Sequence, residues 1–418
     1  MEETKKAKKY LYIGLLIGVL ATSLILTMVF LFVRDHQIEA IRKDYQKRVS
    51  TLSNVKTGTL IDDSVVEKAD YIYSKILSEF YFEDDIDVES MRENMYKGII
   101  NSLNDKYAEY YTAEELADMF TESEGVYYGI GSYVSMDTVT GYPILSGVFN
   151  DSPAEKSGLR DGDIIYEVDG ESIYGLTLTE VTNLIKGPEN TDVELTIVRN
   201  GESDYLHITV TRGKVESPTV TYELKRNGIG YIEIQEFDEV TSTQFDAAYT
   251  DLRSQNIKAL IIDLRSNGGG NLDTVLAICR EILPEGIITY TEDKFGNREE
   301  YTNPKDNSID IPLVILTNGY TASASELMSG AVRDYGLGTL IGTNTFGKGI
   351  VQTIIPAADG SGIKLTTSRY YTPKGECIHG VGIAPDIELE FDGDRYYSDE
   401  AYDNQLEYAI DYLTEKIQ

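Results

Sequence analysis

Three side chains in the last quarter of the chain have types and spacing that suit nucleophilic catalysis: Ser323, Lys348 and Gln352. A short apolar run precedes Ser323, breaks at Asn318 and Gly319, and gives way to a helical pattern. A hydroxyl at the start of a helix lies near unpaired N–H groups and the positive end of the helix dipole, which stabilise a developing oxyanion. The pattern therefore predicts a nucleophilic serine at a strand-to-helix turn.

Lys348 lies between two glycines and opens an alternating run that predicts a strand. Side chains at positions i and i+4 of a strand share a face, so Gln352 is expected to point the same way as Lys348. A lysine can take a proton from serine only when it is uncharged, so burial must lower its pKa from about 10.4 towards the working pH. The residue types suit a nucleophile, a base and an orienting amide. On these residues alone, a salt bridge from Lys348 to a carboxylate remains an alternative.

The spacing of these residues matches a known protease signature. Residues 321–326 read T-A-S-A-S-E, and residues 347–352 read G-K-G-I-V-Q. Together they resemble the signature of the carboxy-terminal processing proteases, which are tail-specific serine/lysine peptidases. Two residues of a helix differ by about 200°, so only one of the two serines can face a site. The resemblance implies that Ser323 rather than Ser325 is the nucleophile, that Lys348 is the general base and that Gln352 positions the lysine.

A glycine-rich loop supplies the expected oxyanion hole. Residues 260–270 read L-I-I-D-L-R-S-N-G-G-G and resemble the oxyanion loop of the same family. The resemblance implies that the N–H groups of Gly269 and Ala324 stabilise the oxyanion. The family usually has a proline or a small residue where this chain has Gly268, which is a departure from its pattern. Glu326 is expected to be a first-turn acid of the helix rather than a catalytic group.

A second resemblance lies upstream of the protease motifs. Residues 128–134 read Y-G-I-G-S-Y-V, and residues 152–170 contain S-P-A-E-K-S-G-L-R-D-G-D; together they resemble a PDZ domain. Successive N–H groups of Gly129, Ile130 and Gly131 can form a nest for a terminal carboxylate, and the following strand offers an edge for a peptide. Without the second string, an ordinary glycine hairpin would explain the first. The sequence therefore predicts a module that binds protein C-terminal tails.

The composition argues against several other classes of protein. The 418 residues carry a formal net charge of −33, which disfavours nucleic acid as a partner. There are three histidines and no HExxH motif, and Cys279 and Cys377 are too far apart to begin a metal cluster, so neither a metal nor another cofactor is expected. The glycine-rich loop could cradle phosphate, but the chain has no GxxxxGK[ST] motif.

The N-terminal segment predicts a membrane anchor. Four lysines lie within residues 1–10, and residues 11–33 contain no charged residue and span about 34 Å as a helix. The lysines predict a cytoplasmic N-terminus and an extracytoplasmic catalytic region on a single-pass cell-membrane protein. The alternative is a cleaved signal peptide, for which residues 21–23 form a poor cleavage site. Residues 34–61 predict a juxtamembrane helix or linker, which either pairs with a second copy in a homodimer or packs on its own domain.

The remaining chain predicts an α/β multidomain protein. Residues 62–120 have helical patterning and include S-L-N-D-K-Y-A-E-Y-Y, a version of the family segment S-L-D-P-Y-S-x-Y without its proline. Residues 121–213 form the predicted PDZ domain, and residues 214–418 form the predicted serine/lysine protease core. The resemblance implies that this core is a crotonase-like spiral of ββα units, with the PDZ domain inserted before it.

These features predict a membrane-anchored serine endopeptidase that binds protein C-terminal tails and acts in processing or quality control of extracytoplasmic proteins. The resemblance also implies that the PDZ domain gates the site by ordering the oxyanion loop when a tail binds. Two other classes remain open at this stage. One is a catalytically inactive PDZ scaffold, and the other is a crotonase-like acyl-CoA enzyme.

Overall fold

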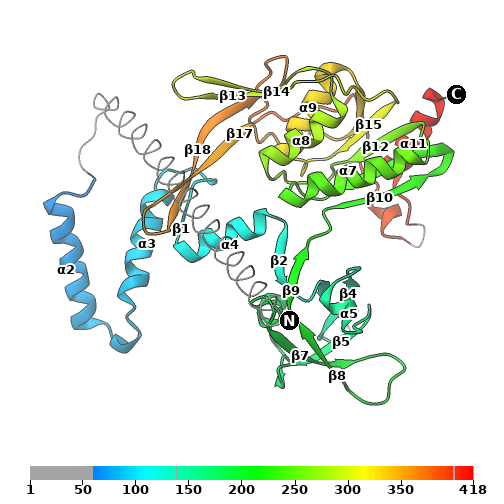
Figure 1. Cartoon of the computed structure of the whole chain (residues 1–418). Helices are drawn as coiled ribbons and strands as arrows, with labels where there is room; N and C mark the ends of the chain where they lie inside the picture. The colour runs from blue at the N-terminus through cyan, green and yellow to red at the C-terminus, as the bar shows by residue number, and fades with distance from the viewer. Residues whose placement is uncertain (1–59, 138–139, 399–400, 418) are drawn as a thin grey trace, which may run out of the picture. The chain divides into compact units, whose positions relative to one another are not determined.

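The computed structural model describes residues 60–137, 140–398 and 401–417 (Figure 1). The predicted cytoplasmic segment 1–10, the predicted membrane helix 11–33 and nearly all of the predicted linker 34–61 lie outside the described residues. Within the described residues, no helix combines the length and the apolar character that crossing a bilayer requires. The chain divides into two compact units between Val88 and Glu89.

The first unit contains helix α2 (Asp63–Glu79) and a short 3-10 turn, η2 (Glu83–Asp85). Asp62 caps α2, because its carboxylate accepts hydrogen bonds from the N–H groups of Ser64 and Val65. No residue of α2 is buried in the described structure, so its apolar side chains remain accessible.

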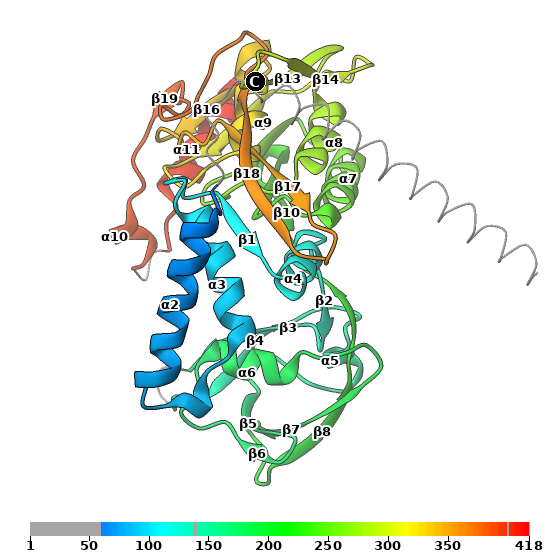
Figure 2. The ribbon, with the colours of Figure 1, turned by 90° about the vertical axis from the view of Figure 1, so that its left-hand side faces the viewer.

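The second unit begins with helix α3 (Val88–Asn101), strand β1 (Glu109–Tyr111) and helix α4 (Ala113–Ser123). Thr112 starts α4 through a capping box, in which its hydroxyl accepts from the N–H of Glu115 and the Glu115 carboxylate accepts from the N–H of Thr112. Strand β1 does not pair with its neighbours in sequence. It lies antiparallel to β18 (Gly362–Tyr371), more than 250 residues later, as Figure 2 shows.

A small β-rich domain follows, built on a five-strand path closed by helices α5 (Pro153–Lys156) and α6 (Leu178–Ile185). Strand β2 (Val126–Gly129) enters this domain and pairs with strand β9 (Gly213–Glu216), which leaves it. Its core is a cluster of buried apolar side chains, among them Leu145, Ile165 and Leu195. The path runs in the order β3 (Ser132–Met136), β4 (Pro143–Val148), β5 (Ile164–Val168), β7 (Asp192–Val198) and β8 (Leu206–Thr211), with β6 (Glu171–Ser172) beside β5.

The largest domain is organised around a six-stranded sheet with one antiparallel edge strand. The other five strands are parallel, which requires long crossover connections between them. The sheet order is β10 (Val220–Lys225), β11 (Ile229–Ile234), β12 (Ala259–Asp263), β15 (Leu313–Thr317), β16 (Gly338–Gly342) and β19 (Ile387–Glu388).

Both faces of this sheet are covered, and its central strands β12 and β15 are buried throughout and mostly apolar. Helices α7 (Glu239–Ser254), α8 (Leu272–Ile282) and α9 (Ala324–Tyr335) pack on one face through residues such as Ile262 and Ile315. Helix α11 (Asn404–Lys416) covers the other face, against the alternate residues of the same strands, as Figure 1 shows.

A second sheet of the large domain contains β1, β18, β13 (Gly286–Asp293) and β14 (Arg298–Asn303), with β17 (Ile350–Pro356) paired to β18. The short elements η3 (Arg226–Gly228) and α10 (Gly393–Tyr396) lie in connections. Strand β18 therefore joins β1, which precedes the β-rich domain in sequence, to β17, which directly follows the Gly347–Gly349 segment.

Candidate active site

Ser323 lies in the turn between β15 and α9, directly before the first residue of the helix. Its backbone has φ 56° and ψ −113°, which is an unfavourable conformation for a residue with a Cβ. Hydrogen bonds hold this conformation on both sides. The Ser323 N–H donates to Glu326 Oε2 at 2.8 Å, and its carbonyl accepts from the Tyr370 hydroxyl at 2.8 Å and from the Leu327 N–H at 2.9 Å. The turn fixes a half-exposed serine at a helix start.

Glu326 joins the serine turn to the lysine loop. Its fully buried carboxylate accepts four hydrogen bonds. Oε2 receives the N–H groups of Ser323 and Lys348, both at 2.8 Å, and Oε1 receives the N–H of Gly347 at 2.7 Å and the hydroxyl of Thr345 at 2.5 Å. Glu326 does lie in the first turn of α9, as the sequence indicates, but its bridging role depends on tertiary contacts that spacing along one helix does not reveal.

Lys348 is half-buried, and its Nζ lies 4.8 Å from the centroid of the Tyr107 ring. Burial lowers the pKa of Lys348, and the nearby charges of Lys364 and Lys106 lower it further, while Glu326 acts in the opposite direction. The net direction favours the uncharged amine that a base requires. The sequence had indicated desolvation, but the two neighbouring lysines were not foreseen.

The predicted strand does not include both Lys348 and Gln352. Strand β17 begins at Ile350, so Lys348 precedes it, and the pairing register with β18 shifts between Val351 and Gln352. The extra residue at this shift is Thr367 of β18, so the shift adds no residue to β17. The Gln352 Nε2 donates to the Thr366 hydroxyl at 3.4 Å.

Ser323, Lys348 and Gln352 nevertheless line one cavity of about 1090 Å³, together with Ala324. Its walls also carry apolar side chains and several carboxylates. Burial, reinforced by the charge of Glu236, raises the pKa of Asp238 in this wall to about 6. No hydrogen bond joins Ser323 Oγ to Lys348 Nζ in the described part of the chain.

The glycine loop after β12 packs directly against the serine turn. A Cβ on Gly269 would lie 2.8 Å from the carbonyl oxygen of Ala322, 2.8 Å from Ser323 Cβ and 3.0 Å from Ala324 N, and Gly269 has φ 106°. Only glycine fits there. The Gly269 N–H donates to Asn267 Oδ1 at 2.8 Å, so its predicted role at an oxyanion requires this hydrogen bond to open. Ala324 is the first residue of α9, where helical N–H groups lack intrahelical partners.

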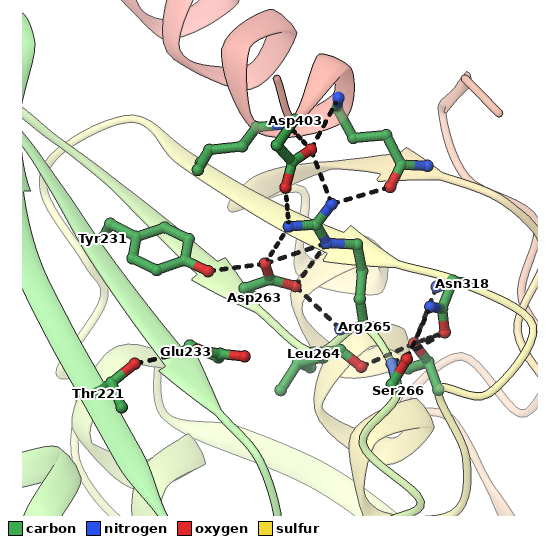
Figure 3. Close-up of polar contacts among 12 residues, drawn as sticks. Thr221, Tyr231, Glu233, Asp263, Leu264, Arg265, Ser266, Asn318 and Asp403 are labelled. Atoms are coloured by element: carbon green, nitrogen blue, oxygen red, sulfur yellow. Dashed lines mark hydrogen bonds and ion pairs between the residues drawn. The ribbon is translucent and has the colours of Figure 1, made fainter. Parts of the chain in front are cut away.

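Asn267 is a buried residue that sequence reasoning missed. Its carbonyl accepts from the Ala322 N–H at 2.9 Å and from the Ser325 hydroxyl at 3.1 Å. The hydroxyl of Ser325, the alternative nucleophile, is therefore fully buried and used structurally. A second link joins the same loops, because the Ser266 N–H donates to Asn318 Oδ1 at 2.9 Å (Figure 3). The D-L-R-S-N-G-G-G string indicates a loop, but it does not indicate that this loop is hydrogen-bonded to the turn that carries Ser323.

An ion-pair network anchors this loop on its other side (Figure 3). Arg265 contacts both oxygens of Asp263 at the end of β12, and both oxygens of Asp403 at the start of α11, at distances from 2.5 to 3.0 Å. It also donates to Gln405, while the Tyr231 hydroxyl donates to Asp263 at 2.9 Å. Burial opposes the charge on Asp403, but Arg265 outweighs it and holds the pKa of Asp403 below its usual value.

The predicted carboxylate nest lies where β2 ends. The carbonyls of Ile130 and Gly131 accept hydrogen bonds within the domain, and Gly131 has φ 82°. The N–H groups of Ser132 and Gly131 face the hydroxyl of Tyr127, although burial dominates and raises the pKa of Tyr127 to about 12. A Cβ on Gly129 would lie 2.9 Å from the Tyr127 ring. A tyrosine hydroxyl therefore lies beside one of the predicted tail-binding N–H groups, that of Gly131.

Comparison with known proteins agrees with this architecture. The model of peptidase family S41 matches residues 228–389, and that of the PDZ domain matches residues 146–199. A carboxy-terminal-processing protease of Bartonella bacilliformis is 37% identical over 310 residues, which cover 73% of this chain and 70% of that protein. A probable CtpA-like serine protease of Staphylococcus epidermidis is 31% identical over 387 residues, covering 92% of this chain and 74% of that protein.

A solved structure of a putative S41 protease from Bacteroides fragilis is similar with a TM-score of 0.51 at 18% identity, over 83% of this chain and 97% of that one. At this identity the likeness is one of fold. The longer and more similar relatives carry the assignment of family. The chain therefore belongs to the carboxy-terminal-processing proteases, serine-type peptidases of family S41 with a PDZ domain.

Proposed function

We propose that this protease cuts peptide bonds with Ser323 as the nucleophile, Lys348 as the general base and Gln352 as the residue that orients the base. The observation that carries the proposal is the Glu326 carboxylate, which binds the backbone N–H groups of both Ser323 and Lys348. Burying a carboxylate costs desolvation free energy, which its four hydrogen bonds offset. The same hydrogen bonds hold the Ser323 turn and the Lys348 loop in a fixed geometry relative to each other.

In the proposed reaction, the uncharged Lys348 amine takes the proton of the Ser323 hydroxyl while Oγ bonds to the scissile carbonyl carbon. The N–H groups of Ala324 and Gly269 stabilise the resulting oxyanion. Lys348 then returns the proton to the leaving amine, and water hydrolyses the acyl-enzyme by the same route. In this scheme the Gly269 N–H leaves Asn267, and the Gln352 amide turns from Thr366 towards Lys348.

The PDZ domain is proposed to capture the C-terminal tail of a substrate protein at Gly129, Ile130 and Gly131. Such a tail would compete with the Tyr127 hydroxyl for the N–H of Gly131, which offers a route from tail binding to the cavity because Tyr127 also lines it. We further propose that tail binding opens the Gly269 hydrogen bond. Deletion of residues 121–213 with unchanged cleavage of tailed and untailed proteins would contradict this gating.

The same proposal includes three further features. These are a membrane anchor at residues 11–33, a crotonase-like spiral in the core, and pairing of residues 34–61 with a second copy. The charge pattern of residues 1–33 supports a cytoplasmic N-terminus and an extracytoplasmic catalytic region. Processing or quality control of extracytoplasmic proteins would follow from that placement.

The decisive experiment compares products from a model protein with a flexible C-terminal tail by mass spectrometry. Wild type should release discrete tail fragments, whereas Ser323→Ala and Lys348→Ala should release none and should stay folded by circular dichroism. A fluorophosphonate probe should label wild type and Ser325→Ala but not Ser323→Ala. Tail cleavage that persists in Ser323→Ala would overturn the assignment, and inactivity of wild type in both assays would favour a non-catalytic PDZ scaffold.

A further inference from the structure

The loop before β1 delivers two side chains to the candidate base. Strand β1 pairs with β18, with Glu109 opposite Lys364, and this pairing fixes the preceding loop over the lysine segment. The Lys106 Nζ lies 4.8 Å from the centroid of the Tyr107 ring and 5.1 Å from that of Phe346. Lys348 Nζ lies 4.8 Å from the same Tyr107 centroid. The two amines are therefore separated by at most twice 4.8 Å.

The other charged groups near Lys348 already have partners. The Lys364 amine is 2.9 Å from the Glu109 carboxylate and also donates to the Tyr111 hydroxyl, so its positive charge is largely balanced. The Glu326 carboxylate is the anion nearest to the lysine loop, and it is occupied by its four hydrogen bonds. The charges of Lys364 and Glu326 are therefore both engaged by partners other than the Lys348 amine.

Lys106 differs because it forms no ion pair with any residue that the structure describes. Within the described residues, no carboxylate lies within 4.0 Å of its Nζ. Asp105 and His379 line the same small cavity as Lys106, but the Asp105 carboxylate accepts a hydrogen bond from the Tyr107 N–H at 3.0 Å. Lys106 is exposed, so its charge acts on Lys348 through a partly aqueous medium.

We propose that Lys106 is a positioning residue for the catalytic step, whose positive charge beside the Tyr107 ring disfavours the protonated form of Lys348 and so maintains it as a base. The proposal rests on the proposed Ser323–Lys348 function. Burial is the largest cause of the lowered pKa of Lys348, and the charges of Lys364 and Lys106 add to it. A neighbouring cation is an established way to keep a reactive lysine uncharged.

The expected size follows from the separation. Two unit charges about 10 Å apart shift a pKa by about 0.3 unit in a water-like medium and about 0.6 unit at half that dielectric constant. At pH values below the pKa of Lys348, activity follows the uncharged fraction. Loss of Lys106 should therefore reduce kcat/KM about two- to fourfold there and leave the high-pH plateau unchanged.

The test measures kcat/KM for a tailed peptide, and the rate of Ser323 labelling by a fluorophosphonate, from pH 5 to 10 at low salt with the purified full-length chain. In Lys106→Met, the acidic limb of both profiles should move up by about 0.3 to 0.6 unit. Lys106→Glu should move it about twice as far, and Lys106→Arg should coincide with wild type. Lys258→Met is the matched control, because Lys258 is exposed and precedes the opposite, amino-terminal end of β12.

A purely structural role of Lys106 would lower the plateau without moving the limb, and that result would overturn the proposal. The proposal would also be overturned if the acidic limb of Lys106→Glu lay within 0.1 pH unit of the wild-type limb. A shift in Lys258→Met equal to that in Lys106→Met would overturn it as well. If Lys106→Met does not fold, Lys106→Glu and Lys106→Arg still show in which direction the acidic limb of the pH profile moves. A wild type without Ser323-dependent hydrolysis would instead refute the proposed function itself.

Discussion

Replacement of Glu326 by glutamine tests the link between nucleophile and base most directly. The side chains have nearly the same shape, but one acceptor oxygen becomes an NH₂ group. If the NH₂ replaces Oε2, the N–H groups of Ser323 and Lys348 both lose their acceptor. If it replaces Oε1, the N–H of Gly347 and the hydroxyl of Thr345 lose theirs. No rotamer of the amide satisfies all four donors.

The size of the loss follows from these contacts. A buried N–H without a partner costs about 1–3 kcal/mol, and the remaining hydrogen bonds lose the assistance of the negative charge. The expected loss is about 2–5 kcal/mol, which corresponds to a fall in Tm of roughly 5–15 °C for a domain of this size. A displacement of about 1 Å between Ser323 and Lys348 should slow turnover about 100-fold.

Differential scanning calorimetry and fluorophosphonate labelling of Ser323 measure the two effects. Glu376→Gln is the matched control, because Glu376 is half-exposed and pairs with Arg333 at the surface, where an ion pair contributes less than about 1 kcal/mol. A Glu326→Gln protein whose Tm lies within 2 °C of wild type, and whose Ser323 is labelled within threefold of the wild-type rate, would refute the reasoning.

Two further predictions concern neighbouring residues. Gly269→Ala should abolish labelling of Ser323 and destabilise the core by about 2–4 kcal/mol, because the new Cβ would lie 2.8 Å from the Ala322 carbonyl oxygen and from Ser323 Cβ. Gly268→Ala should behave as wild type, since nothing lies within 4 Å of its Cβ. Equal effects of the two changes in a denaturation and labelling assay would argue against the packing described. Asp238→Asn should stabilise the fold above pH 6 but not at pH 4. Burial and Glu236 raise the folded-state pKa of Asp238 to about 6 from 3.8, so its contribution to stability is present below pH 3.8 and is lost as the pH rises through 6. With a half-exposed side chain the gain is about 1 kcal/mol, and urea unfolding at both pH values measures it; an equal gain at pH 4 would exclude the carboxylate as the cause.

Local patterns predicted much of this architecture. The apolar run before Ser323 and the glycines around residues 268–270 are local signals, and both correspond to strand-to-helix turns at the carboxyl ends of adjacent parallel strands. The prediction of one strand face for Lys348 and Gln352 depended on an unbroken two-residue period. Because β17 starts at Ile350, Lys348 lies before the strand and that period does not extend to it.

The T-A-S-A-S-E and G-K-G strings and the PDZ-like segment are each continuous in the chain, so the order of residues was enough to predict the catalytic residue types and the family. The contacts between residues far apart in the chain depend instead on how the strands and loops pack. Glu326 reaches across 22 residues to the Lys348 N–H, and Tyr107 and Lys106 reach the same lysine from more than 240 residues away. Such contacts leave no periodic pattern in the sequence, because they arise from the pairing of distant strands, such as β1 with β18. Their effect on the pKa of Lys348 depends on how deeply the side chains are buried, which the spacing of residues does not indicate.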